Sequence, residues 1–186
     1  EDHLEGRIPP PPDDRPVYHA PAEGEVFGRP LRAYVDDLNG PDRLARLRAI
    51  KSLGLISSCK SLLKRALSDY DHSVAHWAGI SLGHLGEDAP ETIAALGEAL
   101  QRVEPSARLG AARALVLLGH VEAAMPVLLE AAKHPEEYVR LSAVETMEII
   151  GAKRAEVRRA LETVMETEKG GYPRRVAAHA LGVKIR

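Results

Sequence analysis

The segment Tyr138-Val139-Arg140-Leu141-Ser142-Ala143-Val144-Glu145-Thr146-Met147 decides the fold, because degenerate copies of it recur along the chain. The copies share an alanine with apolar residues at fixed distances after it. The aligned alanines are Ala49, Ala78, Ala111, Ala143 and Ala177, at spacings of 29, 33, 32 and 34 residues. A near-constant period of this length predicts an array of structural repeats.

Each copy has the pattern of a helix. Val139, Ala143, Met147 and Ile150 recur at helical spacing, and Gly151 is a natural helix stop. A second amphipathic stretch follows in each unit. Examples are Ile93, Leu96, Gly97 and Leu100; Met125, Leu128, Leu129 and Ala132; and Val157, Ala160, Leu161 and Val164. A single hairpin of two such helices cannot bury its apolar face, so the pattern predicts an all-α solenoid of stacked hairpins.

Two positions in the repeat have physical explanations. The small alanine allows neighbouring helices to approach closely, and a larger side chain would overpack the seam. An arginine recurs near the start of each first helix, where its head can reach carboxylates or carbonyl groups of a neighbouring helix. These arginines are Arg46, Arg108, Arg140 and Arg174, and the second unit has Ala75 instead.

The pattern Val-Arg-x-x-Ala-x-x-x-Leu, ending near a glycine, resembles HEAT repeats over residues 41–186. The resemblance implies a curved stack of helical hairpins used for protein binding and scaffolding. A narrower resemblance, to HEAT extensions at the C-terminus of some bacterial sulfatases, rests on three stretches. They are Val74-Ala75-His76-Trp77-Ala78, Leu128-Leu129-Glu130, and Pro135 leading to Tyr138-Val139-Arg140-Leu141.

The catalytic motif of sulfatases is absent around the single cysteine. That motif is Cys/Ser-x-Pro-x-Arg, whereas Cys59 is followed by Lys60-Ser61-Leu62-Leu63. The alternative to a scaffold module that is a subunit or domain of a larger assembly is therefore an accessory C-terminal domain of a sulfatase-like hydrolase, without the catalytic domain.

The chain divides into an extended Pro-rich arm or linker, 1–30, and a HEAT-like solenoid of about four and a half repeats, 31–186. The first segment holds seven of the 13 prolines, with Pro9–Pro12 consecutive, a sequence that favours polyproline II. Two interpretations stay open: a disordered tail, or an arm that docks on a partner through Val17, Tyr18, Val26 and Phe27. Residues 31–38 are predicted to form the first helix.

Charge and composition exclude several function classes. The net charge is −2; residues 1–40 carry nine acidic and four basic side chains, and residues 41–186 carry 18 acidic and 21 basic. This balance lacks the basic footprint of a nucleic-acid binder. No apolar run reaches the roughly 18 to 20 residues of a membrane span. The chain begins at Glu1 without methionine, which fits either a fragment or a processed and exported bacterial protein.

Candidate catalytic and metal-binding residues are few. His72 and His76 share a helix face at i, i+4 with Asp71 nearby, but a zinc site needs three or four ligands and no third set follows. His120 with Glu122 and His134 with Glu136 flank turns between helices and are predicted to be solvated. We therefore expect no catalytic residue, no metal and no cofactor.

The predicted function is non-catalytic binding of another protein or domain within a larger assembly. By analogy with other helical repeats, the second helix of each unit is expected to line the concave face. Trp77, the single tryptophan, is either a partner anchor or a packing residue between repeats. The predicted partner-binding residues are Trp77, Lys64, Glu98, Gln101, Glu130, Lys133, Arg158, Arg159, Tyr18 and Phe27.

Overall fold

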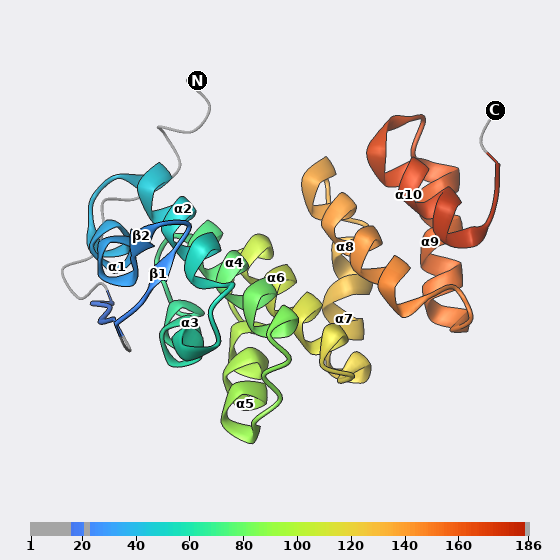
Figure 1. The fold of residues 1–186 in the computed structure, drawn as a ribbon. Helices are drawn as coiled ribbons and strands as arrows, with labels where there is room; N and C mark the ends of the chain where they lie inside the picture. Colours follow the sequence, from blue (N-terminus) through green and yellow to red (C-terminus); the bar gives the residue numbers. More distant parts are fainter. Residues whose placement is uncertain (1–15, 21–22, 185–186) are drawn as a thin grey trace.

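The computed structural model describes residues 16–20 and 23–184, and its helices follow one another as a curved array (Figure 1). Two short strands precede the helices and pair as an antiparallel hairpin. The elements are β1 (Glu25–Val26), β2 (Arg29–Pro30), α1 (Leu31–Asn39), α2 (Arg43–Leu53), η1 (Ser57–Cys59), α3 (Lys60–Ala66), α4 (His72–His84), α5 (Pro90–Ala99), α6 (Pro105–Leu117), α7 (Val121–Ala131), α8 (Glu137–Ile150), α9 (Ala155–Thr167) and α10 (Gly171–Leu181).

The array confirms the predicted all-α solenoid. Helices α2, α4, α6, α8 and α10 contain the aligned alanines and are called the first helices; α3, α5, α7 and α9 are the second helices. Helix α1 precedes them, within a residue of its predicted bounds. Within the described residues, four hairpins are thus followed by α10. Gly119 and Gly151, at the ends of α6 and α8, have φ of 87° and 86°, a conformation suited to glycine.

The first helices form the inner row of the curve. Each of them packs against the next, from α2 to α10, whereas successive second helices in the described chain barely touch one another. The second helices pack instead against first helices of their own or the adjoining unit. In an arc the more closely spaced row lies on the inside, so the expectation that the second helices line the concave face is wrong.

Helices α4 and α6 cross at the closest approach of the array. A Cβ added to Gly110 would lie 2.5 Å from the carbonyl oxygen of His76, and one added to Gly79 would lie 2.6 Å from the carbonyl carbon of Gly110. Both distances are shorter than a carbon side chain tolerates, so the two glycines are what permits this backbone contact. The crossing fixes the centre of the inner row.

The aligned alanines lie at the seams between helices. All five are fully buried, and they join large apolar side chains such as Leu115, Leu128 and Met147 in one continuous core. The predicted packing role of the small residue is confirmed.

The recurring arginines bind carbonyl groups at or just after the end of the preceding helix. Arg46 donates to the carbonyl of Leu38, and Arg108 Nε donates to the carbonyl of Leu100 at 3.1 Å. Arg174 makes the same kind of contact with Met165 and Glu168 at the end of α9, whereas Arg140 binds the carbonyls of His134 and Pro135 in the turn after α7. Because the last carbonyls of a helix have no partner within it, the contacts of Arg46, Arg108 and Arg174 satisfy groups that the helix leaves free.

The second unit has Ala75 in place of the recurring arginine, and an arginine from another part of the sequence takes over its contacts. Arg102, which follows α5, donates from Nη1 to the carbonyl of Leu67 at 2.5 Å and from Nη2 to that of Asp69 at 2.7 Å. The end of α3 is therefore bound by an arginine from the next unit. Burial lowers the pKa of Arg102, although its guanidinium remains charged at neutral pH.

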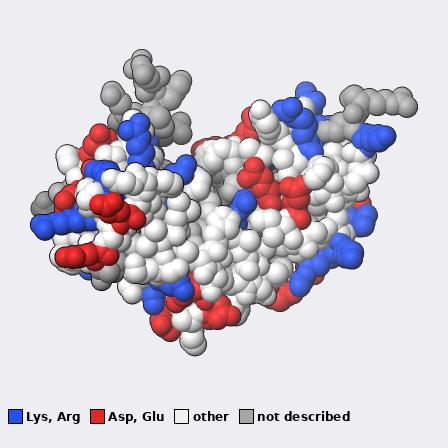
Figure 2. Space-filling view, viewed as in Figure 1, with Lys and Arg blue, Asp and Glu red and all other residues white. Residues whose placement is uncertain are grey.

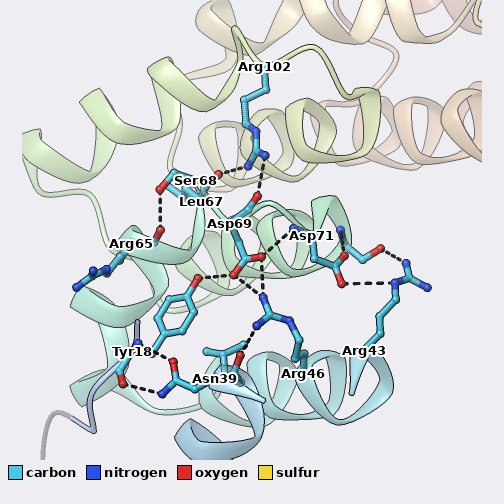
Figure 3. Close-up of polar contacts among 12 residues, drawn as sticks. Tyr18, Asn39, Arg43, Arg46, Arg65, Leu67, Ser68, Asp69, Asp71 and Arg102 are labelled. Atoms are coloured by element: carbon cyan, nitrogen blue, oxygen red, sulfur yellow. Dashed lines mark hydrogen bonds and ion pairs between the residues drawn. The ribbon is translucent and has the colours of Figure 1, made fainter. Parts of the chain in front are cut away.

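Tyr18 is part of the core, which corrects its predicted role as a partner anchor. It is 2% exposed, and its Oη donates to Asp69 Oδ2 at 2.5 Å (Figure 3). Arg46 Nη2 reaches both oxygens of the same carboxylate at 2.7 Å. The side chain of Asn39 binds the backbone N–H and carbonyl of Tyr18 at 2.8 and 2.9 Å. Burial and the adjacent Asp69 carboxylate raise the pKa of Tyr18.

The β1–β2 hairpin also packs on the solenoid, through buried Val26. Tyr34 Oη donates to the carbonyl of Val26 at 3.0 Å, and Arg29 Nη1 binds Asp37 at 2.6 Å. The core of the array thus includes Tyr18 and Val26, which lie in the segment 1–30 expected to be an extended arm or linker. The run Pro9–Pro12 lies outside the described residues.

Candidate functional site

Exposed large apolar side chains gather on the inner row. Six of them occupy equivalent positions in three repeats, either before or after the aligned alanine: Leu44, Leu55, Tyr138, Ile149, Tyr172 and Val183. Scattered surface apolar residues need no explanation, but a set repeated along one face is a candidate interaction surface.

A central hollow of about 540 Å³ lies between α4, α6 and α8. Ile80, Leu109, Leu141, Trp77 and Tyr138 supply its apolar lining. Its polar lining consists of Ser73, His76, His84, Ser106, Arg113, Ser142 and Glu145. Helices α4 and α6, which pack closely at Gly110, thus help to form a mainly apolar depression that is lined by two aromatic residues, Trp77 and Tyr138.

Two further hollows adjoin the central one. The N-terminal hollow, of about 350 Å³, is lined by Phe27, Lys51, Ser52, Gly54, Leu55, Trp77, Ile80, Ser81 and His84. The C-terminal hollow, of about 610 Å³, is lined by Glu136, Glu137, Tyr138, Leu141 and Tyr172. Because adjacent hollows share residues, the three form one surface across the first helices, here named the inner groove.

Trp77 stands between the N-terminal and central hollows. The residue is half-buried and lines both hollows. Lys51 Nζ lies 4.2 Å from the centroid of its ring, a cation–π distance, and the His76 ring meets it edge-on at 5.7 Å. Trp77 therefore packs between repeats and also lines the groove, and its role as a partner anchor stays a prediction.

The polar groups at the centre of the inner groove bind each other. His76 Nδ1 lies 2.8 Å from the carbonyl oxygen of Ser106, which acts as the acceptor for a ring N–H. Burial lowers the pKa of His76, so its neutral form is favoured in the folded chain. Arg113 Nη1 and Glu145 Oε2 form an ion pair at 3.6 Å. These contacts hold the walls of the groove in place across three first helices.

His72 and His76, the candidate metal ligands, contact different partners. His72 Nε2 lies 3.5 Å from Glu104 Oε1, while His76 binds the backbone of Ser106. Within residues 16–20 and 23–184 no group of three or more His, Cys, Asp or Glu side chains is placed to hold a metal ion. Cys59 is buried, and burial raises the pKa of its thiol.

The residues predicted on the second helices lie away from the inner groove. Lys64 and Glu98 line a separate hollow of about 260 Å³ between α3 and α5. Glu130 is exposed and forms a bidentate pair with Arg108, with distances of 3.0 and 2.7 Å, which lowers the pKa of the Glu130 carboxyl. Gln101, Lys133, Arg158 and Arg159 are exposed.

Basic side chains gather around α9 and α10, as Figure 2 shows. Arg154 in this region is paired with Glu122 of the adjacent unit, whereas Arg158 and Arg159 are exposed on α9. Of the predicted partner-binding residues, only Trp77 and Phe27 line the inner groove.

Sequence reasoning missed Tyr138, Tyr172 and Leu55, which line the groove. Their signal was present in the repeat alignment, since Tyr138 and Tyr172 occupy the same position before Ala143 and Ala177. The prediction that the second helices line the concave face directs attention away from this position. In the described chain no helix is both long and apolar enough to cross a membrane.

Three solved structures are similar to this chain. The structure of the complex of CpcE and CpcF of phycocyanin lyase from Nostoc sp. PCC7120 is 16% identical with a TM-score of 0.59, over 81% of this chain and 97% of that chain. A computationally designed armadillo repeat protein for modular peptide recognition is 18% identical with a TM-score of 0.49, over 80% and 79%. An engineered protein is 19% identical with a TM-score of 0.48, over 81% and 77%.

These likenesses concern the fold alone, because the identities are low. A comparison with curated protein sequences finds no match. None of the three structures is of a sulfatase, and the expected relation to sulfatase extensions stays a prediction.

The family model described as HEAT repeats matches residues 31–115 and 93–182, and so covers nearly the whole solenoid. Its two matches overlap in the α5–α6 region, as expected when a model of several repeats fits a longer array in two registers. The chain therefore belongs to the HEAT-repeat family.

Proposed function

We propose that this HEAT-repeat chain is a non-catalytic module that binds a partner protein along the inner groove. The observation that carries the proposal is the repetition of exposed apolar side chains in or just after the first helices, three of which, Leu55, Tyr138 and Tyr172, line the adjoining hollows. A soluble monomer rarely leaves such a face exposed unless a partner covers it.

The composition of the inner groove supports recognition of protein rather than nucleic acid. Its aromatic lining, Trp77, Tyr138, Tyr172 and Phe27, consists of residue types that dominate the energetics of protein interfaces. Its charges are mixed, with Lys51 at one end and Glu136 and Glu137 at the other. A groove that followed a phosphate backbone would be lined by Lys and Arg throughout.

The proposal is tested by affinity purification from the source organism with mass spectrometry of the captured proteins. The groove variant is Tyr138→Ala with Tyr172→Ala, and the outer-face variant is Arg158→Glu with Arg159→Glu. All four side chains are exposed, so both variants should keep the helical circular dichroism spectrum of the wild type. We expect the groove variant to retain the partner at least about tenfold less, as for loss of interface aromatic anchors.

The matched variant separates the two faces of the array. Undiminished capture by the groove variant, together with loss in the Arg158/Arg159 variant, would transfer the binding site to the second helices and overturn the proposal.

A further inference from the structure

The N-terminal hollow differs from the rest of the inner groove because a highly exposed phenylalanine lines it. Phe27 is 80% exposed and lines the hollow from the turn of the β1–β2 hairpin, and Trp77 is also a lining residue. It is the only phenylalanine of the chain. An aromatic ring of this size would ordinarily be buried, so its exposure needs a reason.

The backbone at Phe27 is also unfavourable for this residue type. Its φ is 52°, and Gly28 next to it has a φ of 73°. A two-residue hairpin turn with both central residues at positive φ favours Asn-Gly or Asp-Gly, and a bulky residue at positive φ is an outlier. Such strain persists where the surroundings impose it, and it is concentrated at functional sites.

The surroundings of Phe27 do impose its position. Besides the contacts of Tyr34 and Arg29 described above, Leu31 N–H donates to the carbonyl of Gly24 at 2.8 Å across the hairpin. Both strands are thus attached to α1, and the ring is held beside the hollow instead of in the core. The chain therefore places two aromatic residues, Phe27 and Trp77, on the walls of one cavity.

The charge of this hollow has a single sign. Lys51 is its only lining residue among Lys, Arg, Asp and Glu. Its ammonium lies over the Trp77 ring, and none of the ion pairs among residues 16–20 and 23–184 involves Lys51. A ligand that covers Lys51 removes its water, and this desolvation is offset only if the ligand brings a negative group.

We infer that the N-terminal hollow is the subsite for an acidic–apolar segment of the partner protein. A bulky apolar side chain of that segment enters between Phe27 and Trp77, and an adjacent Asp or Glu carboxylate pairs with Lys51. The inference rests on the proposed function and adds the chemistry of the partner. A volume of about 350 Å³ is at the lower end of the range for ligand pockets, which suits a side chain rather than a whole cofactor.

The probe is a phage-displayed library of random peptides, selected on the immobilised full chain. We expect enriched peptides to carry Phe, Tyr, Trp, Leu or Ile next to Asp or Glu. Their synthetic forms are titrated into the full chain, and binding is followed by the fluorescence of Trp77, the only tryptophan. We expect saturable changes in the Trp77 emission.

Three variants assign the contacts. Lys51→Glu should weaken the selected peptides by about tenfold or more, because an attraction becomes a repulsion beside a partly dehydrated charge. Phe27→Asn should weaken them by a similar factor while the melting temperature stays the same or rises, because Asn-Gly suits this turn. Lys133→Glu, a charge reversal at an exposed residue after α7, should leave the affinity unchanged.

Several results would overturn the inference. They are the absence of enriched peptides, enrichment without acidic residues, and an affinity that Lys51→Glu leaves intact. If the captured partner is lost from the Tyr138/Tyr172 variant but kept by Lys51→Glu and Phe27→Asn, the inner groove binds protein and only the acidic–apolar assignment fails. If the Tyr138/Tyr172 variant also keeps the partner, the proposed function itself fails.

Discussion

At the scale of single residues, the repeat depends on small side chains at the positions where helices pack most closely. Ala111 is fully buried in α6, where α4 crosses it most closely, and a Cβ on Gly79 would lie 2.9 Å from the Ala111 nitrogen. Packing of this kind leaves no room for additional methyl groups, because protein interiors are as dense as organic crystals.

Replacing Ala111 with leucine should therefore destabilise the chain, although leucine is nearly as good a helix former as alanine. We expect the free energy of unfolding in urea to fall by roughly 1–3 kcal/mol, the usual cost of overpacking a core. Ala123→Leu, at an exposed position of α7, is the control and should change it by less than about 0.5 kcal/mol. A neutral Ala111→Leu variant would contradict the repeat register described above.

At the scale of elements, the N-terminal hairpin and its preceding segment cover the end of the array. Tyr18 joins this segment to the turn between α3 and α4 through the Asp69 carboxylate, which Arg46 of α2 also binds (Figure 3). A buried carboxylate needs such partners, since an unpaired charge in the core is costly.

Tyr18→Phe should weaken this connection while keeping the aromatic packing. Removal of a hydrogen bond to a charged group is expected to lower the free energy of unfolding by about 1.5–3 kcal/mol. The matched control is Tyr172→Phe, whose ring is 61% exposed, and it should be neutral in the same denaturation experiment. Equal stabilities for the two variants would show that the Tyr18–Asp69 contact does not hold the segment in place.

At the scale of the whole molecule, the array is nearly one-dimensional, and each unit depends on its neighbours. Helices α4 and α6 have first helices on both sides, whereas α10, among the elements of the described residues, packs mainly against α8 and α9. The central hollow of the inner groove lies where this mutual support is strongest, so its surface is preformed, which would limit the conformational entropy lost on binding.

Amide hydrogen exchange followed by mass spectrometry should show this gradient of stability. We expect the slowest exchange in α4 and α6 and much faster exchange in α10, because local opening needs the least free energy where the fewest buried contacts are broken. Uniform protection from α4 to α10 would mean that the chain opens only as a single unit.

The sequence by itself determined the repeat, the helices and the packing positions. Periodicity places Ala49, Ala111 and Ala143 at seams whatever the overall curvature, because these requirements are local to one hairpin and its neighbour. It did not decide which row of helices lies on the inside of the curve. Whether Tyr138 and Trp77 lie on the concave face was therefore left open. That depends on how closely α4 approaches α6, a distance set by Gly79 and Gly110 meeting across repeats. The position of Tyr18 likewise depends on the carboxylate of Asp69, 51 residues away in the sequence, a long-range contact that no local pattern contains.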